Sequence, residues 1–213
     1  MGPNGAGKTT CFNVLTGKYK PDRGRIEFQG EDITGFSPHE IARKGISRSF
    51  QTMNLFNEFT VLENILIALK EVREHGFDFM HLLARESEVA AKAEKILSRV
   101  GLSGKEYHRT SELAYGDRRS LEIGVALAAE PSLLFLDEPT SGLGAKATTQ
   151  LLDLIHRLKQ KYTIVMIEHD MNFLFELADS ISVIHWGQVI AYGTPDTLRA
   201  NKWVKQSMLG EGA

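Results

Sequence analysis

Residues 2 to 9 read GPNGAGKT, which fits the phosphate-binding pattern GxxxxGK[ST]. In such a loop the backbone N–H groups of residues 5 to 7 point inward together, and the following helix adds the positive end of its dipole. We expect Lys8 to reach the β- and γ-phosphates of a nucleotide and the Thr9 hydroxyl to ligate Mg²⁺. The loop therefore predicts nucleotide binding.

A second candidate site is residues 133 to 138, LLFLDE, an apolar run that ends in two carboxylates. Such a run is typical of a parallel strand buried on both faces, and ligands bind at the carboxyl ends of these strands. Asp137 has the chemistry of a Mg²⁺ ligand, and Glu138 that of a general base or water-orienting group. Taken alone, the run is as easily a strand-to-turn junction, but beside a phosphate loop it indicates a nucleotide-hydrolysing site.

Two further polar residues are expected at the ends of predicted strands. Gln51 follows the strand predicted over residues 46 to 50, where its amide could ligate Mg²⁺ or hold the attacking water. His169 follows the strand predicted over residues 163 to 167 and could contact the γ-phosphate. In isolation each has a plain structural interpretation, so their assignment depends on the other motifs.

Residues 113 to 119, LAYGDRR, form a small turn that opens a helix predicted over 120 to 129. A helix N-terminus attracts anions, yet the chain has no second lysine-bearing loop to hold a phosphate here. We therefore expect Tyr115 and Gly116 to meet a phosphate that another copy of the chain holds.

The elements that must position these residues alternate between strands and helices, which favours an α/β sheet. Further strands are predicted over 25–28, 181–185 and 189–192, the last two as a hairpin, with a turn over 29–32. Helices are predicted over 8–15, 38–44, 151–158, 172–178 and 195–208.

Residues 52 to 112 differ in character, because apolar residues recur there at helical spacing and no clear strand appears. We expect a helical subdomain inserted over 52–112 into an α/β core formed by 1–51 and 113–213.

Composition narrows the class of protein. The 213 residues carry a net charge of -2, which gives no case for nucleic-acid binding. The chain has a single cysteine, which fits a reducing compartment. No apolar run reaches the length of a membrane span, and no signal peptide opens the chain, so we expect a cytoplasmic location.

The motifs and their order resemble those of the ATP-binding subunits of ABC transporters, over nearly all 213 residues. The resemblance implies a P-loop NTPase core with a mostly parallel sheet. It also implies a dimer in which each ATP lies between the phosphate loop of one subunit and the signature motif of the other. By similarity, ATP contacts Asn4, Gly5, Ala6, Gly7, Lys8, Thr9 and Thr10, with Tyr115 and Gly116 in trans. Thr9, Gln51 and Asp137 serve Mg²⁺, and Glu138, His169 and Gln51 are catalytic.

The same resemblance implies partners and a location. The insert 52–112 would dock on a membrane permease, so the subunit would lie on the cytoplasmic face of the plasma membrane. A solute-binding protein outside the membrane would act indirectly. Residues 45–51 (GISRSFQ), 113–116 (LAYG) and 168–171 (EHDM) resemble ATPases for branched-chain amino acid uptake. Urea importers share much of this pattern, and lipopolysaccharide exporters are more distant.

The sequence leaves two other interpretations of its function open. Soluble ABC proteins of translation or DNA repair usually carry two ATPase cores or a long coiled coil, and this chain has one phosphate loop and no long heptads. A catalytically impaired fragment that keeps the motifs is the other reading. It arises because family members begin well upstream of their loop, with strands and an adenine-stacking aromatic residue. We therefore expect the first strands to be missing and ATP binding to be weakened.

The signature region departs from the common Leu-Ser-Gly-Gly-Gln. Asp117 stands where glutamine is usual and adds a carboxylate near an expected phosphate. We expect weaker ATP capture unless Arg118 or Arg119 offsets this charge. Gly144 stands where an Asp or Asn is usual, which bears on communication across the dimer.

Overall fold

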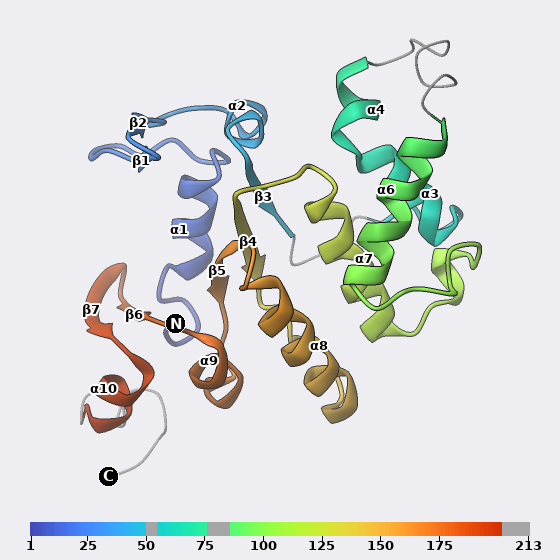
Figure 1. The fold of residues 1–213 in the computed structure, drawn as a ribbon. Helices are drawn as coiled ribbons and strands as arrows, with labels where there is room; N and C mark the ends of the chain where they lie inside the picture. The colour runs from blue at the N-terminus through green and yellow to red at the C-terminus, as the bar shows by residue number, and fades with distance from the viewer. Residues whose placement is uncertain (50–54, 76–85, 202–213) are drawn as a thin grey trace. The chain divides into compact units, whose positions relative to one another are not determined.

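The computed structural model describes residues 1–49, 55–75 and 86–201, drawn as a ribbon in Figure 1. Its helices are α1 (Lys8–Leu15), α2 (Pro38–Arg43), α3 (Val61–Ala68), α4 (Lys70–His75), α6 (Glu86–Arg99), α7 (Tyr115–Leu127), α8 (Ala145–Leu158), α9 (Met171–Leu177) and α10 (Pro195–Ala200), with a 3₁₀ turn η1 (Thr110–Glu112). Its strands are β1 (Glu27–Phe28), β2 (Glu31–Asp32), β3 (Ile46–Arg48), β4 (Leu133–Asp137), β5 (Thr163–Ile167), β6 (Ile181–His185) and β7 (Gln188–Gly193). The predicted α/β alternation is confirmed.

The contacts divide the chain into two compact units. One unit holds Met1–Ile41 and Met166–Ala213, and the other holds Ala42–Val165. The sequence-based division into a core (1–51 and 113–213) and an insert (52–112) follows different boundaries, and it stays a prediction.

The strand that carries Asp137 lies in a three-stranded sheet with the order β3-β4-β5. β3 and β4 run parallel, with Arg48 opposite Phe135. Leu134 and Leu136 are 0 % exposed, as expected for a strand covered on both faces. Because the two strands are parallel, their carboxyl ends share one edge of the sheet, and Asp137 ends β4 at that edge.

Two short hairpins use the same turn chemistry. β1 pairs antiparallel with β2 through Gln29 and Gly30, and β6 pairs antiparallel with β7 through Trp186 and Gly187. Each pair of turn residues has positive φ values, 51° and 81° in the first and 50° and 75° in the second. Such two-residue turns match the twist of antiparallel strands. The β6–β7 hairpin was predicted correctly, whereas the turn predicted over 29–32 is shorter, because Glu31–Asp32 forms β2.

Helices α3, α6 and α7 pack together in the second unit. Ile65 of α3, Leu97 of α6 and Leu121 of α7 are all 0 % exposed. Gly124 of α7 allows this approach, since a Cβ there would lie 3.0 Å from Ile65 Cδ1. The helical character predicted for 52–112 therefore holds in its described part, which contains α3, α4, α6, η1 and an isolated bridge between Thr60 and Arg109.

Several predicted helix limits were wrong. α8 begins at Ala145 rather than Leu151, directly after the extended backbone of Gly144 (ψ 164°). α7 begins at Tyr115 rather than Ser120, because Ala114 is already an extended N-cap residue with ψ 153°. The first turn of a helix needs no intrahelical N–H bonds, so glycine and aspartate are tolerated there. The helix predicted over 195–208 ends at Ala200, because the extended backbone of Asn201 (ψ 117°) caps it.

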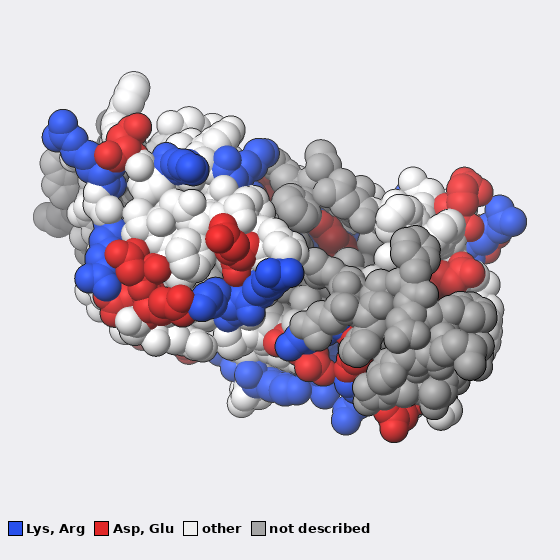
Figure 2. Space-filling model, turned by 90° about the horizontal axis from the view of Figure 1, so that it is seen from above, with Lys and Arg blue, Asp and Glu red and all other residues white. Residues whose placement is uncertain are grey.

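The described residues include no helix that is both long and apolar enough to span a membrane. Figure 2 shows Lys and Arg side chains interspersed with Asp and Glu over one face, in keeping with the small net charge of -2.

Candidate functional site

The phosphate loop closes around the ammonium group of Lys8. Lys8 Nζ donates hydrogen bonds to the carbonyl oxygens of Gly2 (2.7 Å) and Pro3 (2.9 Å). An ammonium group has three N–H donors, so these two contacts leave one for a ligand. Gly5 and Gly7 adopt φ values of 77° and 95°, which glycine takes without strain. The loop thus combines tight curvature with a positive charge, as phosphate binding requires.

Helix α1 presents an uncapped N-terminus directly after this loop. Its N-cap residue, Gly7, makes no side-chain cap, and its first turn contains no acidic residue. The first N–H groups of a helix have no intrahelical partners, so they remain donors for an anion beside the positive end of the dipole. Asn4, Thr9 and Thr10 are exposed beside them.

The β6–β7 hairpin holds the loop in place from both ends. The backbone nitrogen of Met1 donates to Ser182 O (2.7 Å), and Met1 O accepts from Ile184 N (2.7 Å). At the far end of the loop, Gly187 N donates to Ala6 O (2.9 Å). The β6–β7 hairpin is therefore the element that supports the phosphate loop.

The contact between the loop and β6 is too close for any side chain at residue 2. A Cβ on Gly2 would lie 2.1 Å from Ile184 O. The Met1 side chain is 6 % exposed and packs in an apolar cluster with Val183. Burial, with the nearby Lys8 charge, lowers the pKa of the Met1 amino group to about 6.

Asp137 lies at the carboxyl edge of the β3-β4-β5 sheet and pairs with a cation from the neighbouring strand. Its side chain is 1 % exposed, and its Oδ2 forms a 2.6 Å salt bridge with Arg48 Nη2 of the neighbouring strand β3. Its Oδ1 is buried with no hydrogen-bond partner among the described residues. An unpaired buried carboxylate oxygen is costly, so this atom fits a cation ligand.

The unpaired Oδ1 of Asp137 indicates whether this edge of the sheet fits a Mg²⁺ ion. Within the described ranges, no three His, Cys, Asp or Glu side chains gather into a metal cluster. Mg²⁺ usually needs no such cluster, because one or two carboxylates hold it together with substrate phosphates. Asp137 therefore fits a Mg²⁺ ion that is held largely by a nucleotide.

Glu138 follows in a strained backbone conformation. Its φ of 44° lies in the left-handed region, which costs a non-glycine residue about 1–2 kcal/mol. Glu138 is half-buried, and its carboxylate makes no hydrogen bond or ion pair with any described residue. A strained residue with an uncommitted carboxylate, at the ligand-binding edge of a sheet, suits a general base.

Arg119 of α7 holds the backbone that carries both carboxylates. Its Nη2 donates to the carbonyl oxygens of Asp137 (2.9 Å) and Glu138 (2.9 Å), and its Nε donates to Pro139 O (3.1 Å). Arg119 is 3 % exposed, and Glu122 balances its charge through a 2.5 Å contact. The strained turn is thereby fixed from the helix that begins at Tyr115.

The N-terminus of α7 is also uncapped, since the N-cap residue Ala114 makes no side-chain hydrogen bond. Tyr115 is 51 % exposed, and its hydroxyl donates to Ser141 O (3.3 Å). Gly116 packs closely on α8, where an added Cβ would lie 3.0 Å from Ala147 Cβ. The exposed start of α7 matches the anion-binding turn expected there.

The charge of Asp117 is offset by a residue that sequence reasoning missed. Lys105 Nζ forms a 2.6 Å salt bridge with Asp117 Oδ2. Arg118 instead donates to Ser111 O (2.5 Å), and Arg119 is buried against the turn after β4. Neither of the two arginines named as possible counter-charges offsets Asp117, because their place on the helix directs them elsewhere.

His169 extends from the end of β5 with its side chain 57 % exposed. The adjacent Glu168 is 0 % exposed, and its Oε2 accepts hydrogen bonds from the backbone nitrogens of His169 (3.0 Å) and Asp170 (3.4 Å). Glu168 thus fixes the backbone while the His169 imidazole remains accessible.

Gln51 lies outside the described residues. The strand that leads toward it ends at Arg48, and Ser49 N then donates to Phe135 O (2.8 Å). Ser49 Oγ is buried without a hydrogen-bond partner in the described part of the chain, at the same sheet edge as Asp137.

The predicted residues are distributed over the two units. The phosphate loop and His169 belong to the first unit, whereas Tyr115, Gly116, Asp137 and Glu138 belong to the second. Sequence reasoning missed the supporting residues Arg48, Arg119 and Glu168. Each had one signal, which was a charged residue within, directly before or directly after a segment with the spacing of a buried element.

Comparison with a family model identifies residues 1–141 as an ABC transporter domain. The high-affinity branched-chain amino acid transport ATP-binding protein LivG of Escherichia coli is 42 % identical over 99 % of this chain and 86 % of its own length. BraF of Pseudomonas aeruginosa, with the same description, is 41 % identical over the same shares.

Solved structures agree at the level of the fold. The ADP conformation of MJ1267, an ATP-binding cassette of an ABC transporter, matches with a TM-score of 0.85 and 33 % identity, over 99 % of this chain and 86 % of the other. A dimeric post-hydrolysis state of the cassette MJ0796, bound to ADP and Pi, matches with a TM-score of 0.75 and 25 % identity, over 92 % and 83 % of the two chains.

Proposed function

Because this chain belongs to the ABC transporter family, we propose that it is the ATP-binding and ATP-hydrolysing subunit of an importer for branched-chain amino acids. The catalytic part of this proposal rests on one observation, the arrangement of the two carboxylates at the end of β4. There Asp137 keeps a buried unpaired oxygen, and Glu138 presents an uncommitted carboxylate.

The names of the relatives support the choice of solute. LivG and BraF, each more than 40 % identical to this chain, are both branched-chain amino acid transport proteins. This favours branched-chain amino acids over urea, the alternative solute that the sequence motifs left open.

Nucleotide binding falls to the phosphate loop and the start of α1. The backbone N–H groups of Gly5, Ala6 and Gly7 bind phosphate oxygens, with Asn4 and Thr10 beside them. Lys8 donates the N–H that the loop carbonyls leave to the β- and γ-phosphates. The negative charge of the phosphates is met by this ammonium and by the uncapped N-terminus of α1.

The Thr9 hydroxyl, the Asp137 carboxylate and the Gln51 amide are the ligands that the chain offers to Mg²⁺. When bound, the ion neutralises charge on the phosphate oxygens. Asp137 supplies its Oδ1, which no described residue hydrogen-bonds.

Hydrolysis depends on Glu138. Its carboxylate orients a water molecule and accepts the proton as the water oxygen attacks the γ-phosphorus, while the bond to the ADP oxygen breaks. His169 donates a hydrogen bond to a γ-phosphate oxygen, and Gln51 helps to hold the water. The products are ADP and inorganic phosphate.

A second copy or a related subunit completes each site. Tyr115 and Gly116 open an uncapped helix with no lysine-bearing loop of its own, so we assign them to ATP held by the partner subunit. The dimeric state of the cassette MJ0796 supports this arrangement.

The insert 52–112 is assigned to docking on the permease, with a solute-binding protein acting across the membrane. Docking would hold the subunit at the cytoplasmic face of the plasma membrane. No nucleic-acid partner is proposed, since the chain carries a net charge of -2.

Substitution Glu138→Gln tests the catalytic assignment in the complex with its permease. We expect phosphate release to fall by about 10²–10⁴-fold, the usual contribution of a general base, while ATP binding persists. Wild-type turnover by Glu138→Gln would remove Glu138 as the base.

A matched control separates catalysis from folding. Glu88→Gln changes an exposed glutamate on α6 and should leave turnover unchanged. Failure of the wild-type complex to release phosphate at all would favour the catalytically impaired reading instead. Uptake assays with leucine and with urea then distinguish the two solutes.

A further inference from the structure

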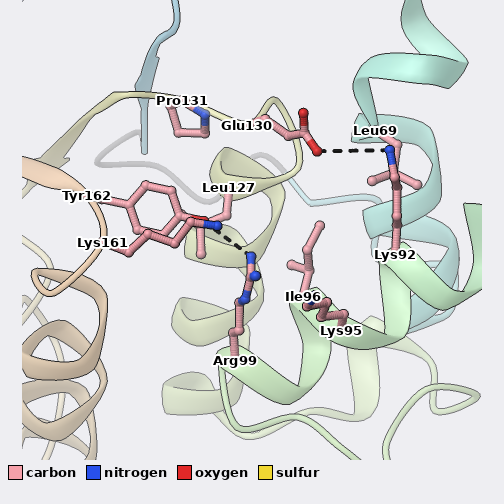
Figure 3. Close-up of a pocket in the computed structure, with 10 residues that line it drawn as sticks. All are labelled: Leu69, Lys92, Lys95, Ile96, Arg99, Leu127, Glu130, Pro131, Lys161 and Tyr162. Atoms are coloured by element: carbon pink, nitrogen blue, oxygen red, sulfur yellow. Dashed lines mark hydrogen bonds and ion pairs between the residues drawn. The ribbon is translucent and has the colours of Figure 1, made fainter.

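A hollow of about 400 Å³ opens in the second unit, and none of the residues that line it is assigned to the nucleotide (Figure 3). Lys92, Lys95 and Arg99 of α6 line it on one side, and Lys161, in the segment before β5, lines it opposite. Its volume lies in the range of small-molecule sites, about 300–1,000 Å³.

The cations of this hollow are largely uncompensated. Lys92 contacts Glu71 and lies 4.0 Å from Glu130, so its charge is balanced. In contrast, no carboxylate of the described residues lies within ion-pair distance of Lys95, Arg99 or Lys161. Like charges gathered without counter-charges repel, and an anion placed among them removes that cost.

Two of these cations contact the same aromatic residue, Tyr162. Arg99 Nη1 donates to the Tyr162 hydroxyl (3.3 Å), and Lys161 Nζ lies 5.3 Å from the centre of the Tyr162 ring. Figure 3 shows the Arg99 side chain directed toward Lys161 and Tyr162. Tyr162 is only 8 % exposed, so it is a fixed support for both cationic groups.

The deeper wall of the hollow is apolar. Leu69, Leu127 and Ile96 line it with exposures of 1 %, 2 % and 6 %. A fully hydrated inorganic ion gains nothing from such a wall, whereas an anion with an apolar body buries surface against it.

We propose that this hollow binds a small organic phosphate monoester with an apolar body. A phosphate monoester carries about −1.5 to −2 charges at neutral pH, more than a single carboxylate, which suits three uncompensated cations. The planar guanidinium of Arg99 matches a phosphate through paired N–H donors, with Lys95 and Lys161 as point charges.

The probe is para-fluorophenyl phosphate, followed by fluorine NMR on the full chain with excess Mg²⁺ and ADP to fill the nucleotide site. We expect saturable line broadening. Lys161→Gln, a change at an exposed residue, and Arg99→Gln should each weaken binding about tenfold, the effect of losing a charge-assisted hydrogen bond. Lys20→Gln, an equal charge change at a residue that does not line the hollow, should leave binding unchanged.

Two comparison ligands define the chemistry. Para-fluorobenzoate should bind more weakly, and para-fluorobenzyl alcohol should not bind. Any of three results would overturn the proposal. The neutral alcohol could broaden equally, the probe could bind wild type and both pocket variants equally, or its binding could be lost when ADP is added. Inorganic phosphate and unlabelled phenyl phosphate are then compared as competitors of the probe. Equal affinity of the two would contradict the role of the apolar wall.

Discussion

The guanidinium of Arg119 donates a 2.9 Å hydrogen bond to the backbone carbonyl of Glu138. This contact joins the helix that begins with the signature residues to the turn that carries the proposed base. Arg119 donates to backbone carbonyl oxygens of this turn, so it acts as a positioning residue.

Substitution Arg119→Met should lower both stability and turnover. It breaks the buried ion pair of Arg119 with Glu122, which is 5 % exposed, at a cost of about 3–5 kcal/mol. The freed turn should lower kcat for ATP hydrolysis, with little change in KM because the phosphate loop is untouched.

The double variant Arg119→Met with Glu122→Met separates these two effects. Replacing both members of a buried ion pair with apolar residues is often neutral for stability. We therefore expect the double variant to recover its urea midpoint but not its kcat. Recovery of wild-type kcat together with stability would show that Arg119 has no positioning role.

Arg48 should compete with Mg²⁺ for Asp137, since its 2.6 Å salt bridge occupies Oδ2 of that carboxylate. In Arg48→Met, Asp137 loses this counter-charge and should bind Mg²⁺ more tightly. We expect the Mg²⁺ concentration that gives half of the maximal stabilisation of the ADP complex to fall about tenfold. Thermal melting against Mg²⁺ concentration measures this without any assay of turnover. Asp137→Asn is the control and should show a much weaker Mg²⁺ response; an unchanged midpoint in Arg48→Met would contradict the competition.

Gly2→Ala should detach the phosphate loop from β6, because the added Cβ would lie 2.1 Å from Ile184 O. Overpacking of this kind costs about 1–3 kcal/mol. We expect a lower melting temperature and weaker ADP binding in calorimetry. Gly144→Ala is the matched control, since Gly144 has an ordinary φ of -81° and an added Cβ would meet open space. Equal affinity of Gly2→Ala and wild type for ADP would show that β6 does not support the loop.

The N-terminus of α3 carries a capping box that can be tested by itself. Thr60 Oγ1 accepts from Glu63 N (3.2 Å), and Glu63 Oε2 accepts from Thr60 N (2.7 Å). Thr60→Ala should cost about 1 kcal/mol of unfolding free energy, measured by urea denaturation. Thr148→Ala, at a residue within α8, is the comparison and should cost less.

The same box predicts a dependence on pH. Hydrogen bonds from the backbone and hydroxyl of Thr60 lower the pKa of Glu63 from its ordinary value of 4.5. Because the pKa is lower in the folded state, this stabilisation is complete above the unfolded pKa and is lost as pH falls through the folded pKa. Unfolding free energy measured between neutral and acidic pH should therefore fall less in Glu63→Gln than in wild type. A parallel decline of the two would remove Glu63 from the acid response.

Much of the site could be predicted because its signals are local in the sequence. The phosphate loop, the apolar strand ending in Asp137 and Glu138, and the β6–β7 hairpin each depend on neighbouring residue types. The limits of α7 and α10 were less predictable, since they depend on the backbone conformation of single cap residues, Ala114 and Asn201.

The contacts that tune these motifs join residues far apart in the chain. Arg48 and Asp137 are 89 residues apart and meet only because β3 and β4 pair in parallel with a fixed register. The cations of the hollow likewise come from α6 and the segment before β5. The sequence by itself determined the family, the phosphate loop and the two carboxylates, because these follow from local spacing. The tertiary structure alone decided which cation holds Asp137, which arginine holds Glu138 and where unpaired charges gather, because strand register and helix packing bring distant side chains together.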